Sequence, residues 1–140
     1  MNRRTAILYA LGGIGSVAAI PLINFFGGKS NYIPDIVKAS GEPVVLSLIA
    51  NEKEILEIGR TIDAQSAETV DGDKLIAMVL EGIPKNCYSP NLNEPEFKLN
   101  ISRKIQSEFK NKQIRVVNGW VLSKTESIQC HLHHWLSTQR

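Results

Sequence analysis

Residues 130–134 are the part of the sequence best suited to chemistry, because they read Cys-His-Leu-His-His. At about 100° per residue on a helix, Cys130, His133 and His134 fall within an arc of about 100° and could face one ligand. Thiolate and imidazole ligands suit zinc, copper or haem iron. These three residues define a hypothetical metal or haem site, for which Cys87 or His131 would supply the further ligands of a closed tetrahedral site. In the alternative interpretation the histidines face solvent or a partner, and Cys130 is buried or disulfide bonded.

The sequence holds two cysteines, Cys87 and Cys130. An even pair in an exported chain is a candidate disulfide, whereas in the cytosol the same residues would be free thiols. The interpretation of this pair therefore depends on where the protein resides.

Nucleophilic catalysis receives little support from the sequence. A serine or cysteine nucleophile needs a neighbouring base and an orienting acid, and neither a nucleophile elbow nor an acid with a recognisable relation to the histidines is present. The carboxylates near residues 52–57 and 71–73 lie where helices are expected to begin. The positive end of the helix dipole favours acidic residues at these positions, so no catalytic role is needed to explain them. No catalytic residue is assigned, and a non-catalytic role is favoured over enzymatic activity.

Residues 1–26 have the character of a signal or transmembrane anchor. Arg3 and Arg4 precede residues 6–26, which carry no charge. A helix of roughly 20 apolar residues matches a hydrocarbon core of about 30 Å, so this segment could cross a membrane, with the arginines on the cytoplasmic side. Ser-Val-Ala at residues 16–18 also fits the pattern that signal peptidase reads, and cleavage after Ala18 is the alternative.

The rest of the sequence predicts a linker at residues 27–31 and one small, mainly α domain at residues 32–140. Apolar spacing and capping residues predict the helices, and Asn118-Gly119 within residues 114–122 is typical of a short hairpin or a tight extended turn. The expected helices cover residues 32–40, begin at Asn51 and at Asp71 or Gly72, span 97–112, and begin again at Ser123.

The charge balance of this domain argues against nucleic acid as a partner. Arg3 and Arg4 account for the excess of basic residues, since the chain has 16 Lys and Arg, 14 Asp and Glu and a net charge of +2. A nucleic-acid surface needs a net basic face to neutralise phosphates. The folded part is neutral and has no basic run of that kind.

The two tryptophans, Trp120 and Trp135, have two interpretations. Tryptophan is enriched at the centres of protein interfaces, so both are candidates for partner contact. Trp120 follows a glycine turn and precedes a capping box, which makes it a suitable wedge between an extended segment and the last helix. Packing in the core is the favoured role.

Three segments resemble a known group of proteins. Asn-Arg-Arg-Thr-Ala-Ile-Leu at residues 2–8 resembles the start of a twin-arginine export signal, although Ala stands where Phe is usual. Residues 117–126, Val-Asn-Gly-Trp-Val-Leu-Ser-Lys-Thr-Glu, look like a segment of small bacterial proteins that carry such signals, and residues 55–60 look like their first helix. These proteins are similar, more loosely, to subunit 3 of gluconate 2-dehydrogenase. The histidine cluster is not part of this pattern.

The resemblance implies a helical accessory subunit that binds, escorts or tethers a larger periplasmic oxidoreductase. It implies a location at the bacterial inner membrane with the domain on the periplasmic side, or in the periplasm if the signal is cleaved. The expected partners are this larger subunit and, through residues 6–26, the membrane. The second hypothesis is a periplasmic metal- or haem-binding module that uses Cys130, His133 and His134, and no other cofactor is expected.

Overall fold

The computed structural model describes residues 34–68 and 70–139. The expected signal or anchor at residues 1–26 and the linker at 27–31 lie outside this part, as does the export motif at Arg3 and Arg4 and the cleavage site after Ala18. Among the helices that are described, none combines the length and the apolar character needed to span a membrane.

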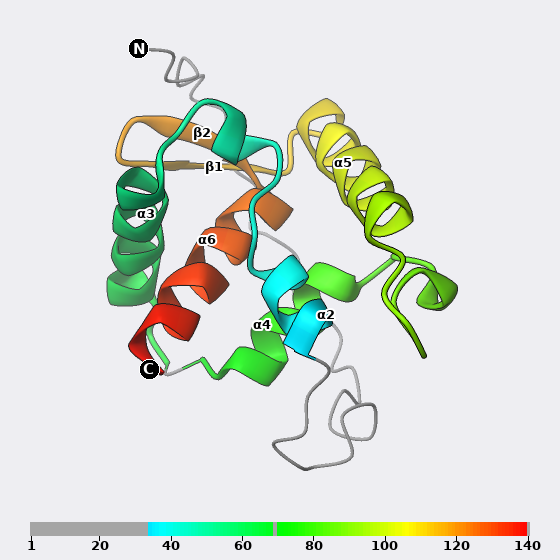
Figure 1. The fold of residues 1–140 in the computed structure, drawn as a ribbon. Coiled ribbons are helices and arrows are strands. Elements are labelled where there is room, and N and C mark those ends of the chain that lie inside the picture. The colour runs from blue at the N-terminus through cyan, green and yellow to red at the C-terminus, as the bar shows by residue number, and fades with distance from the viewer. Residues whose placement is uncertain (1–33, 69, 140) are drawn as a thin grey trace.

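The described chain is mainly helical and has one short hairpin, as the sequence predicts. Figure 1 shows α6 running through the middle of the domain, with α3 and α5 on either side of it. The elements in chain order are α2 (Pro34–Ser40), the 3₁₀ turn η1 (Leu46–Leu48), α3 (Glu52–Gln65), α4 (Gly72–Leu80), the 3₁₀ turn η2 (Lys85–Cys87), α5 (Glu94–Lys110), β1 (Ile114–Val117), β2 (Trp120–Ser123) and α6 (Lys124–Thr138).

Side-chain caps fix where the longer helices begin. Asn51 starts α3 and Ser123 starts α6, and each forms a full capping box with the glutamate three residues later, as predicted. Asp71 caps α4 by accepting a hydrogen bond from the backbone N–H of Lys74 at 2.9 Å. These caps satisfy backbone donors that a helix leaves unpaired at its first turn.

Two boundaries differ from the sequence-based expectation, the start of α5 and the end of α4. Helix α5 begins at Glu94, after the cap Asn93, instead of at residue 97. The apolar stripe predicts that the helix after Asp71 continues to Pro84, but α4 ends at Leu80 and Gly82 takes a positive φ of 81°. The last carbonyls of α4 are satisfied from another helix, since Lys104 Nζ donates to the carbonyls of Met78 and Val79 at 3.0 and 2.9 Å. A tertiary contact therefore stabilises the earlier end.

The extended segment is a true hairpin, which settles the alternative left open by the sequence. β1 and β2 pair antiparallel, with Val117 opposite Trp120. Asn118 and Gly119 both have positive φ, 53° and 82°, as a type I′ turn requires. Ser123 ends β2 and caps α6, so the strand leads directly into the central helix.

The core forms two hydrophobic clusters that share α6. One holds residues of α3, η1 and the hairpin, together with Cys130. The other holds residues of α2, α4, α5 and η2, together with Ile128 and Leu132 from α6. The residues of α6 from Thr125 to Leu132 are all buried. Helix α6 therefore has no solvent-facing side over its first two turns, and its polar side chains need partners inside the protein.

Candidate functional site

The structure places Cys130, His133 and His134 of α6 in three different environments. Cys130 is fully buried, and its burial, with the nearby Glu126 carboxylate, raises the pKa of the thiol. His133 Nδ1 lies 3.1 Å from the carbonyl oxygen of Gly41, whereas His134 lies against Gly59 of α3. No group of three His, Cys, Asp or Glu residues within the described ranges is arranged to hold a metal ion. The structure thus does not bring Cys130, His133 and His134 together, because each of them has different neighbours.

The predicted disulfide between Cys87 and Cys130 is also absent. Both cysteines are free and buried. Cys87 belongs to the cluster of α4 and α5, and Cys130 belongs to the cluster of α3 and the hairpin, on another side of α6. Each thiol acts as a small core residue.

The tryptophans have separate environments. Trp120 is 1% exposed and lies in the core, as its favoured interpretation requires. Trp135 is half-buried, and its ring covers Gly72 at the start of α4, where an added Cβ would lie 2.3 Å from Trp135 Cζ3. Contact of Trp135 with a partner stays a prediction.

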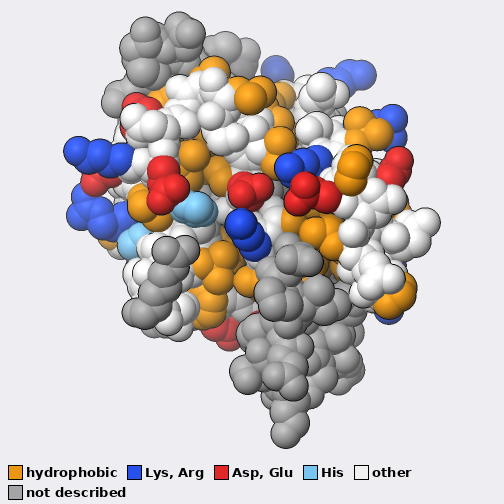
Figure 2. Space-filling model, in the orientation of Figure 1, with side chains coloured by type: hydrophobic (Ala, Val, Ile, Leu, Met, Phe, Trp, Pro, Cys, Tyr) orange, Lys and Arg blue, Asp and Glu red, His pale blue; other side chains and the backbone are white. Residues whose placement is uncertain are grey.

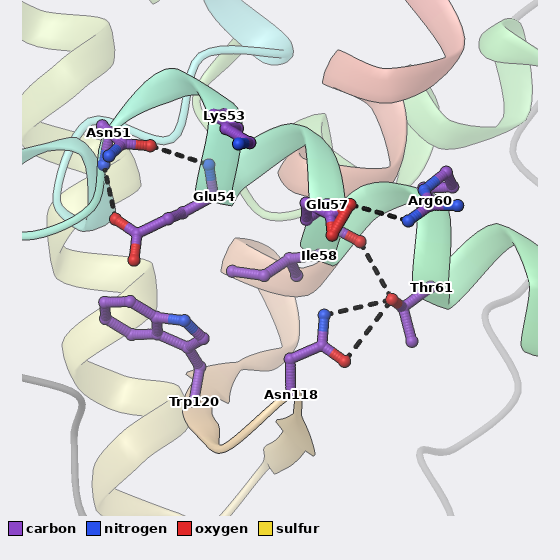
Figure 3. A pocket seen from close by; sticks show the side chains of 9 residues that line it. All are labelled: Asn51, Lys53, Glu54, Glu57, Ile58, Arg60, Thr61, Asn118 and Trp120. Carbon is purple, nitrogen blue, oxygen red and sulfur yellow. Dashed lines mark hydrogen bonds and ion pairs between the residues drawn. The ribbon is translucent and has the colours of Figure 1, made fainter.

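A groove runs between α3 and the hairpin, and we name it the α3 groove. Its volume is about 630 Å³, within the range of about 300–1,000 Å³ that is usual for ligand pockets. In Figure 3, Ile58 of α3 and Trp120 of the hairpin lie among the polar side chains of the two elements. The lining residues are Asn51, Lys53, Glu54, Glu57, Ile58, Arg60, Thr61, Asn118 and Trp120.

Most polar side chains of the α3 groove are engaged with each other. Glu57 and Arg60 form an ion pair at 2.6 Å, and Asn118 Nδ2 donates to Thr61 Oγ1 at 3.0 Å (Figure 3). Glu54 is occupied by the capping box with Asn51. Side chains held in pairs present a fixed pattern of charge and hydrogen-bonding groups, and such a pattern suits recognition of the surface of another protein.

A second hollow, of about 420 Å³, shares one wall with the α3 groove. This wall is an exposed ridge on α3 that is formed by Lys53, Glu57 and Arg60. His134 and Ser137 of α6 complete the second hollow. Of the predicted metal ligands, His134 is the one that reaches this surface. The ridge therefore presents charged side chains with a depression on each side.

An exposed apolar residue precedes the α3 groove. Leu48 in η1 is 81% exposed and stands three residues before Asn51, which lines the groove. Figure 2 shows positive and negative side chains interspersed on this face, with hydrophobic side chains and histidine between them. Single exposed apolar side chains are common on protein surfaces, so Leu48 gains meaning only together with the charged groove that follows it in the chain.

The α3 groove has no local signal in the sequence. Its walls come from residues 51–61 and 118–120, which the chain brings together through contacts across 57 residues. The turn signal at Asn118-Gly119 places Asn118 at a hairpin tip, but it does not say that the tip meets Thr61.

Comparison of the chain with models of protein families, with curated proteins and with solved structures found no match.

Proposed function

We propose that this chain is a non-catalytic accessory subunit that binds, escorts or tethers a larger periplasmic oxidoreductase. Residues 1–26 export the domain or anchor it at the inner membrane, and the domain contacts the partner through the α3 groove and Leu48. The observation that carries the proposal is the α3 groove, about 630 Å³ in volume and lined by polar side chains held in pairs, with the exposed Leu48 three residues before it in the chain.

The geometry of this surface favours a protein partner. A buried leucine contributes about 1.5–3 kcal/mol relative to an exposed one, so covering Leu48 would stabilise a complex. Lys53, Glu57 and Arg60 lie on the ridge beside the groove, where charges of both signs can orient a partner with the complementary pattern. The class of partner rests on the resemblance of residues 2–8, 55–60 and 117–126 to the small twin-arginine proteins.

Co-purification from the native host tests the proposal. The full-length chain, tagged at its C-terminus and extracted with a mild detergent, is expected to co-elute with a larger subunit that mass spectrometry identifies as a cofactor-containing oxidoreductase. Recovery of the chain without such a subunit, from cells that express the neighbouring genes, would contradict the accessory role.

Two leucines provide a matched pair of variants for the binding surface. Leu48→Asp is expected to reduce the recovered partner at least tenfold, because it places a charge where an apolar contact is proposed. Leu99→Asp is the control, since Leu99 is also exposed, at 44%, and belongs to α5, which Figure 1 shows on the opposite side of α6 from α3. Equal loss of partner in both variants would place the contact elsewhere.

A further inference from the structure

A separate hollow lies between α3, α4, α6 and β1, and we name it the basic hollow. Its volume is about 230 Å³, which is below the usual range of ligand pockets and limits it to a small molecule. Ile62, Leu75 and Ile128 supply apolar walls, and Lys74, Arg115 and Lys124 supply positive charge. No aspartate or glutamate is among its lining residues.

The positive charge of Arg115 has no acidic partner within the described ranges. The guanidinium donates to the neutral amide oxygen of Gln65 at 2.9 Å, and its partial burial lowers the arginine pKa. A guanidinium prefers two oxygen atoms of one carboxylate or phosphate, which its planar fork matches. Arg115 is therefore a partly desolvated cation with capacity for an anion.

The two lysines add to this field. In the part of the chain that the structure describes, neither Lys74 nor Lys124 forms an ion pair. Two acids contact lining residues of the hollow: Asp63 Oδ1 lies 2.9 Å from Nε2 of His131, and Asp71 Oδ1 accepts the backbone N–H of Lys74 at 2.9 Å as the cap of α4. The carboxylate of Asp63 is thus used by the histidine and does not pair with the three cations.

We propose that the basic hollow binds a small organic carboxylate whose short apolar body packs on Ile62, Leu75 and Ile128. The carboxylate pairs with Arg115 and with the lysines beside it. Ser66 and Ser127 also line the hollow, but their hydroxyl groups already donate to the carbonyls of Ile62 and Lys124. Charge, and not hydroxyl hydrogen bonding, is therefore the main source of selectivity. This site is independent of the accessory role proposed above.

Benzoate is a suitable probe, because it combines a carboxylate with a compact apolar ring. Titration of the full-length chain in a neutral detergent, with empty micelles as the blank, is followed by NMR through the Arg115 side-chain N–H and the Ile128 amide. Saturable binding with a Kd of about 1 mM or tighter is expected. Benzyl alcohol and inorganic phosphate, which each lack half of the proposed ligand, are expected to bind at least tenfold more weakly.

Three variants locate the site. Arg115→Gln is expected to weaken benzoate binding at least tenfold, because it removes the charged half of the contact. Lys74→Gln is expected to weaken it several-fold, and since Lys74 is exposed this variant keeps the fold even if Arg115→Gln does not. Arg103→Gln, an exposed residue of α5 outside the hollow, is expected to bind as the natural sequence does.

Any one of three results would overturn the proposal. Benzyl alcohol could bind as tightly as benzoate, phosphate could bind as tightly as benzoate, or benzoate binding could be unchanged in both Lys74→Gln and Arg115→Gln. Loss of benzoate binding in Arg103→Gln to the same extent would show a general effect of net charge and would also overturn it.

Discussion

Glu108 of α5 accepts two hydrogen bonds from Thr125 in the first turn of α6, one from the backbone N–H and one from the hydroxyl, each at 2.7 Å. Glu108 is 5% exposed and Thr125 is fully buried. The carboxylate therefore satisfies a backbone donor that the helix leaves unpaired, and its negative charge lies at the positive end of the helix dipole. This contact joins α5 to the central helix.

Replacing Glu108 with Gln is expected to lower the free energy of unfolding by about 1–3 kcal/mol, because hydrogen bonds to a charged acceptor are stronger than neutral ones. Urea unfolding followed by circular dichroism measures the change. Gln106→Ala, at an exposed position of the same helix, is the control and is expected to stay within about 0.5 kcal/mol. The double variant with Thr125→Val is expected to cost less than the sum of the two single changes. Full additivity would show that the two residues do not act together.

Gly59 allows α3 and α6 to approach closely, and its replacement by Ala is expected to be severe. A Cβ atom at this position would lie 2.1 Å from the carbonyl oxygen of Cys130 and 2.7 Å from Cβ of His134. The backbone of α6 cannot move aside without disturbing the core, so we expect Gly59→Ala to cost about 3 kcal/mol or more.

Gly82 provides the matched control for this change. An added Cβ there meets no atom within 4 Å, and the positive φ of 81° is its main obstacle. Gly82→Ala is therefore expected to cost about 1–2 kcal/mol, measured by the same unfolding experiment. If Gly59→Ala were the less costly of the two, the close approach of α3 and α6 at Cys130 would be incorrect.

Local signals in the sequence predicted most of the fold. The capping boxes of Asn51 with Glu54 and Ser123 with Glu126 span three residues each, and Asn118-Gly119 defines a turn by itself. Such signals depend on the backbone conformation of neighbouring residues, so they can be recognised without knowledge of the tertiary structure. They predicted the hairpin and the starts of α3, α4 and α6, whereas α5 begins at Glu94 and not at the expected residue 97.

The surfaces could not be predicted in the same way. The α3 groove depends on a contact between Thr61 and Asn118, and the basic hollow depends on the hairpin bringing Arg115 beside Gln65, 50 residues earlier. The structure separates the proposed metal ligands for a related reason. An arc of 100° places Cys130, His133 and His134 on one side of an isolated helix, but in the domain this arc is shared between α3 and the segment that contains Gly41.

Burial of Cys130 makes stability depend on alkaline pH. Its pKa is raised, first by burial and then by the Glu126 carboxylate, whereas an unfolded thiol ionises near pH 8.5. Below that pH both states hold the proton, and the contribution of the thiol to stability is constant. Above it the unfolded state loses the proton and the folded state keeps it, so the contribution falls by up to about 1.4 kcal/mol per pH unit.

The difference in the free energy of unfolding between the natural chain and Cys130→Ala isolates this effect. Lys104, whose pKa is lowered by burial to about 8, and Tyr88, whose pKa is raised, also titrate in this range, but they are present in both proteins and cancel. The difference, from urea unfolding at intervals between pH 6.5 and 10.5 under reducing conditions, is expected to be flat below about pH 8 and to move in favour of the alanine variant above it. A difference that stays flat to pH 10.5 would mean that the thiol ionises equally in the folded state, and a fully buried Cys130 could not do so.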